Sequence, residues 1–392
     1  MIQERQKIME QLKAFLCGHY LRPDGSFGRN GVVLVSGEKI TAAGTGFEIP
    51  DHAEIIDASA YYVTPGLIEC HGHLAMDEVN ETSDPMTPDV RIYDIMAPEN
   101  RDIEFIRNAG FTVHCTLPGS ANVIGGTGLA VKLKPGRTVE DIAIPEVQPL
   151  KMALGDNPKM SYGLKGRTPV TRMANMALAR KTFAEARKYL EKREKNELEA
   201  PDLRLEPVAD AIAGKRRVRI HAHKPVDIAQ AVRFSEEFGL DYTVEHCTGG
   251  RYIAEFLLEH HVRCNVGPLL INPLKNEMED QDPANPGCLE KAGITDMALI
   301  MDDSWSTAFL PAAAGTCVSQ GLSLEAGMRG ITIEAAKTLK LENRMGSLAA
   351  GMDADIAVFT GHPLKNTSRC VTTVIDGVLY GGLLDKGGVR RV

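Results

Sequence analysis

The sequence predicts an α/β protein in which a (β/α)8 barrel, or TIM barrel, carries a small β-sandwich. From residue 66 to about 345, strand-like and helix-like segments alternate, as in parallel strands joined by helical crossovers, and their number favours a closed barrel. Short β runs separated by turn residues precede and follow this region. We therefore assign residues 65–345 to the barrel, and 1–64 and 346–392 to the sandwich.

The first 64 residues change character near residue 15. Residues 1 to about 15 are predicted to form a short helix. Three β runs follow between clusters of Gly, Pro, Asp and Asn, at residues 32–35, 39–43 and 54–57. The first residues are too polar for a signal peptide, and no run of eighteen apolar residues is present, so we expect a cytoplasmic protein with no membrane span.

Composition narrows the class of partner. The chain has 392 residues, of which 43% are hydrophobic and 24% charged, as in ordinary soluble globular proteins. Its net charge of −8 argues against a surface for nucleic acid or for an anionic membrane. We expect a small-molecule substrate, and a homo-oligomer is compatible with the sequence. The eight cysteines form no Cys-x-x-Cys pair and are expected to be reduced, mostly buried thiols.

The barrel region is predicted from its alternating segments. The predicted strands are residues 111–116, 218–221, 242–246, 262–266 and 297–302. The predicted helices are residues 103–110, 171–199, 227–238 and 251–260. The glycine-rich segment 119–128 lacks the pattern of a phosphate-binding loop and is interpreted as a loop after the second strand. After residue 346, strands are predicted at 351–359 and 371–378.

The most informative stretch is the end of the first barrel strand. An apolar run begins after Pro65-Gly66 and ends in His71-Gly72-His73. Side chains two residues apart on a strand point the same way, so both imidazoles share one face. Two imidazoles at a strand end can bind a divalent metal. A bare His-x-His is more often structural, but the His and Asp positions downstream favour a metal site.

Three other predicted strands end in side chains that bind metals. His221 ends the strand at 218–221, His246 ends the strand at 242–246, and Asp302 ends the strand at 297–302. Each alone would more often be structural. With His71 and His73 they give four imidazoles and one carboxylate at the same end of a barrel, a ligand mixture that borderline divalent metals take.

These motifs resemble the amidohydrolase superfamily, in particular the group related to imidazolonepropionases and prolidase-like metal-dependent hydrolases. The resemblance rests on the segment 65–73, on His221, His246 and Asp302, and on the tail segment 346–356. It implies one or two divalent ions, zinc by default, with iron and manganese as alternatives.

The resemblance also implies roles for the ligands. His71 and His73 would bind the more buried metal, and His221 and His246 would come from the fifth and sixth strands. Asp302 would contact metal and shuttle a proton to the leaving nitrogen. A bound ion lowers the pKa of its water from ~15.7 towards ~7, which provides hydroxide at neutral pH.

Lys151 and His223 each leave alternatives open. Family members with two metals have a carboxylated lysine at the position that Lys151 matches; the alternative is a lysine that contacts substrate or pairs with a carboxylate. Without carboxylation, one metal is expected, and His246 would orient substrate. His223 shares a face with His221 and is interpreted as a substrate contact rather than a ligand. Asp303 should point away from Asp302 if the strand stays extended.

The predicted function is that of a metal-dependent amidohydrolase, which hydrolyses a C–N bond in an amide or a cyclic amide through metal-activated water. Two alternatives remain. One is a ring aminohydrolase (a deaminase) that releases ammonia, although the His-Ala-His-Lys segment lacks the acidic residue that such enzymes have near His221. The other is a non-catalytic scaffold with the same fold.

Overall fold

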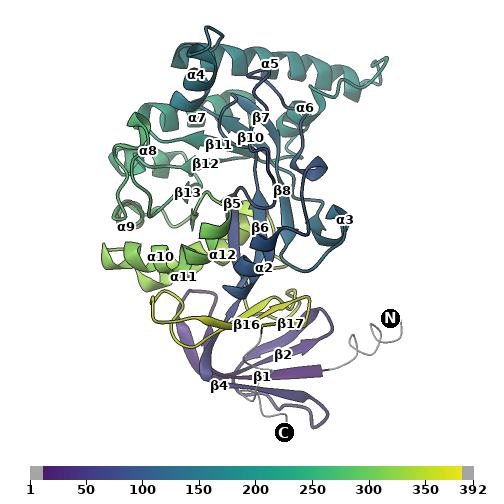
Figure 1. Cartoon of the computed structure of the whole chain (residues 1–392), viewed down its shortest axis with the longest axis vertical. Coiled ribbons are helices and arrows are strands. Elements are labelled where there is room, and N and C mark those ends of the chain that lie inside the picture. Colours follow the sequence, from purple (N-terminus) through teal and green to yellow (C-terminus); the bar gives the residue numbers. More distant parts are fainter. Residues whose placement is uncertain (1–11, 382–392) are drawn as a thin grey trace.

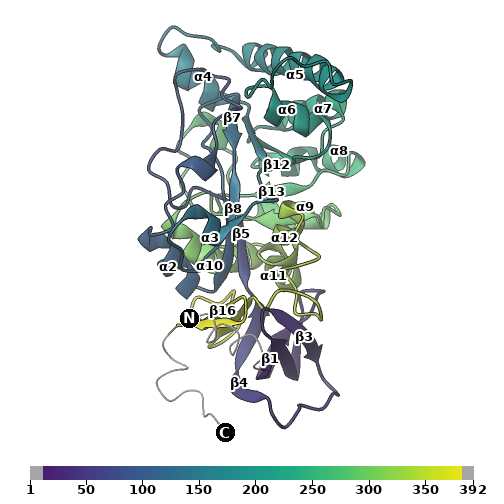
Figure 2. The same ribbon diagram turned by 90° about the vertical axis from the view of Figure 1, so that its right-hand side faces the viewer.

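The computed structural model describes residues 12–381 and shows a mixed α/β protein with three β-sheets (Figure 1). The sheets have seven, six and four strands. The seven-stranded sheet lies at one end of an elongated molecule, and the long helix of residues 172–194 lies at the other, as the second view also shows (Figure 2).

The seven-stranded sheet joins the two ends of the described chain. Its strands are β1 (Leu12–Leu21), β2 (Phe27–Ser36), β3 (Lys39–Gly44), β4 (Glu54–Pro65), β15 (Ile356–Phe359), β16 (Cys370–Ile375) and β17 (Val378–Tyr380). Their order is β17-β16-β15-β4-β1-β2-β3. Strand β4 pairs with β1 in parallel and with β15 in antiparallel orientation, so the tail rejoins the first strands through β4.

The middle of the chain forms the other two sheets. The six-stranded sheet contains β7 (Ile124–Thr127), β10 (Leu150–Ala153), β11 (Val218–Ala222), β12 (Tyr242–His246), β13 (Cys264–Val266) and β14 (Met297–Leu299). Strands β10 to β14 are parallel and pair in chain order, while β7 pairs with β10 in antiparallel orientation. The four-stranded sheet contains β5 (Leu67–Gly72), β6 (Phe111–Thr116), β8 (Leu129–Lys132) and β9 (Ala143–Ile144).

Helices connect and cover these strands. The α-helices are α2 (Arg101–Asn108), α3 (Val139–Ile142), α4 (Asp156–Gly163), α5 (Arg172–Glu194), α6 (Glu206–Ile212), α7 (Pro225–Phe238), α8 (Ala254–Glu259), α9 (Asn285–Lys291), α10 (Leu310–Ser319), α11 (Leu324–Gly330) and α12 (Ile333–Leu339). Four short 3-10 helices are η1 (Ile92–Asp94), η2 (Gly250–Ile253), η3 (Asn276–Met278) and η4 (Trp305–Phe309). No helix of the described part is long and apolar enough to cross a membrane.

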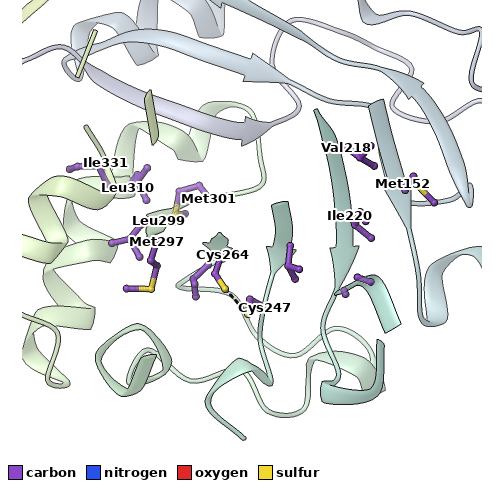
Figure 3. Close-up of a cluster of buried hydrophobic side chains, with 14 of the residues drawn as sticks. Met152, Val218, Ile220, Cys247, Cys264, Met297, Leu299, Met301, Leu310 and Ile331 are labelled. Atoms are coloured by element: carbon purple, nitrogen blue, oxygen red, sulfur yellow. Dashed lines mark hydrogen bonds between the residues drawn. The ribbon is translucent and has the colours of Figure 1, made fainter. Parts of the chain in front are cut away.

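The two faces of the parallel strands differ in chemistry. Met152, Val218, Ile220, Cys264 and Leu299 belong to one hydrophobic core with side chains of the helices, such as Leu310 of α10 (Figure 3). The residues between them are polar: Lys151, Arg219, His221, Glu245 and Asn265 are all buried. Because side chains alternate along a strand, these polar residues share the face turned away from the helices. These five buried polar side chains therefore lie on one side of this sheet.

Two predictions about local structure are wrong. The predicted helix at 1–15 falls partly on residues 1–11, outside the described residues, and its remainder belongs to β1, where pairing with β2 and β4 on both sides determines the conformation. The glycine-rich segment 119–128 is not only a loop, because it contains β7. Gly126 adopts a φ of +105°, which glycine tolerates, as β7 bends along β10.

Other boundaries differ by a few residues. The long helix α5 ends at Glu194 rather than 199, and β14 ends at Leu299, three residues before Asp302. All eight cysteines are free thiols, and six of them are buried, as expected. The buried thiols of Cys247 and Cys264 lie 3.5 Å apart (Figure 3).

One buried cation joins the seven-stranded sheet to the rest of the molecule. The ammonium group of Lys132, at the end of β8, lies 3.0 Å from Asp353 Oδ2 and 3.2 Å from Asp355 Oδ1, and it also contacts Asp376. Although burial opposes ionisation, Lys132 holds the pKa of Asp353 and of Asp376 below the usual value. Lys132 is thus the lysine that all three carboxylates of the tail segment contact.

We predict that Lys132→Met lowers the free energy of unfolding by about 3–5 kcal/mol, because removing one partner leaves buried carboxylates without compensation. The change corresponds to roughly 5–15 °C in Tm, measured by thermal denaturation. Lys134→Met is the matched control, since Lys134 contacts Asp376 alone and its side chain is 34% exposed; it should cost about 1 kcal/mol or less. Equal losses in the two variants would contradict this role of Lys132.

Candidate metal centre

The structure brings all seven predicted site residues together. His71 lies in β5, Lys151 in β10, His221 in β11 and His246 at the end of β12. The other three, His73, His223 and Asp302, follow β5, β11 and β14 within three residues. Six of them form two neighbouring groups of three, in which the His71 ring of the first group lies 5.1 Å from the His246 ring of the second.

The first group consists of His71, His73 and Asp302. Oδ1 of Asp302 lies 3.2 Å from Nε2 of His71 and 3.3 Å from Nε2 of His73. Two donors bound to one zinc ion at 2.0–2.1 Å in a tetrahedral arrangement would lie about 3.3 Å apart. The spacing of these three atoms therefore matches that of ligands around one ion.

The hydrogen bonds of the first group determine which ring nitrogens can bind. Nδ1 of His73 lies 2.9 Å from the carbonyl oxygen of Leu117, and Nδ1 of His71 lies 2.6 Å from Oε2 of Glu245. Both oxygens accept hydrogen bonds, so each Nδ1 carries the proton and each Nε2 carries a lone pair. Two imidazole nitrogens and one carboxylate oxygen thus point at the same place, which a cation between them would stabilise.

The second group consists of His221, His223 and His246, whose potential ligand atoms all lie within 4.8 Å of one another. Nδ1 of His246 lies 2.9 Å from the carbonyl oxygen of Gly267, so its Nε2 carries a lone pair. This Nε2 is buried and has no hydrogen-bond partner within residues 12–381. A buried nitrogen without a partner is costly, and a bound cation would explain it.

The other two histidines of this group are oriented by hydroxyl groups. Nδ1 of His221 lies 2.9 Å from Ser120 Oγ, and Nδ1 of His223 lies 2.7 Å from Thr248 Oγ1. Hydrogen bonds at Nδ1 are the usual means of orienting a metal-binding imidazole. His223 is therefore placed among the imidazoles of the second group, whereas the sequence suggested a contact with substrate.

Lys151 lies beside the first group. Its Nζ is 3.0 Å from Nε2 of His71, and the side chain is fully buried. Burial lowers the pKa of Lys151 to about 8. The amine therefore approaches the same lone pair that a cation in the first group would use.

The backbone is left-handed at two positions, at the end of β12 and just after β14, and this conformation sets the direction of the side chains there. His246 has a φ of 69° and Asp302 a φ of 58°. Few residues other than glycine adopt such angles, and they occur most often at functional sites. At Asp302 the turn also separates the two aspartates: Asp302 faces the histidines, while the Asp303 carboxylate accepts a hydrogen bond from Ser306 Oγ at 2.5 Å. The backbone oxygen of Asp303 accepts from the His73 amide.

Burial and charge determine the protonation of the site. Burial lowers the pKa of His71, and it lowers the pKa of His221 and of His246 strongly. It lowers the pKa of His223 to about 4. Burial opposes ionisation of Asp302, but its histidine neighbours hold the pKa of this carboxyl well below its usual value. Neutral imidazoles and an ionised carboxylate are the forms that bind metals.

Sequence reasoning missed three carboxylates and one guanidinium that support the site. Arg219 and Glu245 form a fully buried pair, with Nε to Oε1 at 2.6 Å and Nη2 to Oε2 at 2.8 Å. Glu245 in turn orients His71. Both residues lie on the polar face. Arg219 lies two residues before His221, so strand periodicity could have identified it, whereas Glu245 directly precedes His246 and alternation alone would put these two on opposite faces.

Glu69 connects β5 to the segment that carries Asp302. Its Oε1 accepts from the amide of His71 at 3.0 Å, and its Oε2 accepts from the amide of Met301 at 2.9 Å. Burial raises the pKa of Glu69 to about 8. Because Glu69 lies two residues before His71 on the same strand face, it too could have been identified from the sequence.

Glu277 could not have been identified in this way. It lies in η3, and its Oε1 is 3.3 Å from Nε2 of His221 and 3.9 Å from Nε2 of His223. No strand, motif or periodicity marks this position in the sequence. His114, by contrast, is buried in β6 and contacts Thr116, outside both groups.

Comparisons with known proteins agree with this architecture. The model of the amidohydrolase family matches residues 295–380. The crystal structure of an amidohydrolase from Thermotoga maritima MSB8 is 33% identical, with a TM-score of 0.88 over 93% of this chain and 98% of that chain. A prolidase solved with N-methylphosphonate-L-proline is 18% identical, with a TM-score of 0.63 over 95% of this chain and all of that chain, and supports the fold alone.

A longer relative is the amidohydrolase tasK of Hapsidospora irregularis, which is 27% identical over 366 residues. That match covers 84% of this chain but only 37% of the relative, so this chain spans little more than a third of that protein. The Thermotoga maritima relative is matched over nearly its whole length at 33% identity. On this evidence, the chain belongs to the amidohydrolase family.

Proposed function

We propose that this protein is a metal-dependent hydrolase that cleaves a C–N bond in an amide or a cyclic amide. One observation carries the proposal: imidazole nitrogens and a carboxylate oxygen from separate strand ends converge at the spacing of ligands around one ion. His73 Nε2 and Asp302 Oδ1, 3.3 Å apart, are the clearest pair. The family and its hydrolase members support the reaction class.

We further propose that the six- and four-stranded sheets close into a (β/α)8 barrel. At one seam, the amides of Gly128 and Ala130 donate to the carbonyl oxygens of Pro149 and Val147. At the other, Glu69 binds the amide of Met301, and the amide of His73 donates to the Asp303 oxygen. The seams support a barrel over 65–345, with the end segments 1–64 and 346–392 as a separate β part.

The donor set fits one or two divalent ions. Imidazole nitrogens and carboxylate oxygens suit zinc, which we propose as the metal, and also iron or manganese. His71, His73 and Asp302 would hold one ion, and His221 and His246 a second. A divalent ion in such a site supplies a nucleophilic water at neutral pH and polarises the carbonyl of the substrate.

Asp302 is the residue that moves protons in this proposal. Its Oδ1 faces the imidazoles of His71 and His73, and its side chain is 24% exposed, more than those of the buried histidines. The carboxylate takes a proton from the attacking water and delivers it to the leaving nitrogen as the C–N bond breaks. One water is consumed, and a carboxylic acid and an amine are formed.

We propose that Lys151 acts as a carboxylated lysine between the two ions. An ammonium group 3.0 Å from Nε2 of His71 would compete with a metal for that lone pair. The neutral amine would add CO2 with loss of one proton, and the resulting carbamate on Nζ would remove the competition and offer two oxygens for ligation. His246 then serves as a ligand through its unpartnered Nε2 rather than as a contact for substrate.

A ring aminohydrolase remains the second candidate because of Glu277. The sequence lacks an acid beside His221, but the fold places Oε1 of Glu277 at 3.3 Å from its Nε2. A structure of an adenosine deaminase from Xanthomonas campestris, 15% identical, shares the fold. Against this candidate, Oε1 already accepts from Lys275 at 2.7 Å. Release of ammonia from ring substrates would favour the deaminase, and release of amines from N-acyl amino acids, dipeptides or cyclic amides favours the amidohydrolase.

We predict that His71→Ala abolishes metal binding in the first group and reduces turnover to background, because it removes one of three converging donors. Elemental analysis and kinetics on an amide library measure the two effects, and circular dichroism verifies the fold. His261→Ala, at an exposed position, is the control. Turnover by a folded, metal-poor His71→Ala protein would contradict the proposed site.

We predict that Asp302→Asn lowers kcat by about 10²–10⁴-fold, because an amide cannot accept the proton of water. Asp303→Asn is a matched neighbour: its carboxylate contacts Ser306, and kcat should stay within a few-fold of wild type. Steady-state kinetics on the same substrate compares them. The reverse order of effects would assign the proton transfer to Asp303.

We predict a carbamate signal in the ¹³C NMR spectrum of protein loaded with metal in ¹³C-bicarbonate. The signal should be absent from Lys151→Met, which keeps an apolar side chain of similar length at this buried position. A fully metal-loaded wild-type protein without the signal would show that Lys151 remains an amine.

A further inference from the structure

We propose that His223 and Glu277 complete the second metal position, so that one cation has four protein ligands: His221, His223, His246 and Glu277. This inference rests on the proposed function, and it adds two donors to the pair of histidines at the second position. Together with the proposed carboxylate on Lys151, they give nitrogen and oxygen donors of the kind that zinc, iron and manganese take.

The geometry of Glu277 supports a ligand role. Its side chain is fully buried, and Oε1 lies 3.3 Å from Nε2 of His221, the separation of about 3.3 Å expected for two ligands of one tetrahedral zinc. Nε2 of His223 lies 3.9 Å from the same oxygen. The potential ligand atoms of the three histidines lie within 4.8 Å of one another. The three imidazoles therefore surround one small volume, and Oε1 of Glu277 lies at its edge beside His221 and His223.

The imidazoles of His223 and His246 are stacked, so the two rings lie next to each other with nearly parallel planes. Their ring centroids are 4.6 Å apart with planes inclined by 16°, and the His221 ring lies 4.5 Å and 4.3 Å from them. His223 is oriented by Thr248 and His246 by the oxygen of Gly267. The unpartnered Nε2 of His246 is the buried atom that most needs a cation.

The backbone is shaped to admit the carboxylate of Glu277. A Cβ atom at Gly155 would lie 2.4 Å from Oε2 of Glu277, and Gly155 has a φ of +82°. The same Oε2 accepts from the amide of Asp156, the first residue of α4, at 2.6 Å. Two features of the β10–α4 turn thus hold a fully buried carboxylate beside the imidazoles of His221 and His223.

Lys275 is the cation that Glu277 contacts in this structure. Its Nζ lies 2.7 Å from Oε1 of Glu277 and 2.8 Å from Oδ1 of Asn157. The alternative to a metal site is therefore an ion pair of Lys275 with Glu277, with His221 as a hydrogen-bonded neighbour. The two interpretations differ in one measurable quantity, the number of cations that the protein binds.

The test is a titration of metal-free protein with Zn²⁺ by isothermal calorimetry, and with Co²⁺ by its visible absorption, which reports the ligands directly. We expect two cations per wild-type chain. Glu277→Gln and His223→Asn should each weaken one of the two by more than the ~100-fold that loss of an outer-shell partner costs, and leave the other unchanged. Glu279→Gln is the matched control, since Glu279 lies two residues on and contacts Lys224 at the surface.

Each outcome has a defined meaning. Two cations bound with wild-type affinity by both Glu277→Gln and His223→Asn would overturn the four-ligand site while leaving the proposed hydrolase intact. No cation bound by the wild-type chain would instead overturn the proposed function itself. Thermal denaturation of the metal-free proteins identifies a variant that fails to fold, and the remaining variant then decides the question.

Discussion

The orientation of the imidazoles by their Nδ1 atoms is the constraint on which the site depends. His73 and His246 each face a backbone carbonyl, and His71 faces the carboxylate of Glu245. Because those oxygens only accept, the opposite nitrogens of the rings carry lone pairs. The Nε2 atoms of His71 and His73 are directed at the carboxylate of Asp302. A cation bound between these atoms would stabilise the arrangement.

Buried charged residues on the strands beneath the site compensate its charges and hold its histidines in place. Arg219 neutralises Glu245 at the centre of the polar face, so that His71 can have an ionised partner without an uncompensated buried charge. Glu69 binds the amides of His71 and Met301 and so fixes the distance between β5 and the turn at Asp302. A change in either residue would move donors that are not themselves altered.

The sequence predicted the parts of the site that follow strand periodicity. His71 with His73 and His221 with His223 are two residues apart, and each pair shares a face. Lys151, His246 and Asp302 lie in or just after strands. Because the parallel strands of a barrel end at the same face, the sequence predicted that these residues meet there. The same rule applied to Arg219 and Glu69 would have predicted their contribution, whereas Glu245 directly precedes His246 and does not follow from it.

Other features could not be predicted because non-local contacts determine them. Glu277 lies in a short 3-10 helix whose position depends on contacts with Gly155 and Asp156, more than a hundred residues earlier in the chain. Strand β1 begins in a segment with a helical pattern, and pairing on both sides overrides it.

The most direct test of the account is the metal content of the protein as purified from cells without added metal, measured by mass spectrometry of the elements and normalised to chains. Converging lone pairs at two positions predict between one and two equivalents of a divalent transition metal, retained through gel filtration. Less than about 0.1 equivalent, with no uptake when zinc is supplied, would contradict the account and favour a scaffold without catalysis.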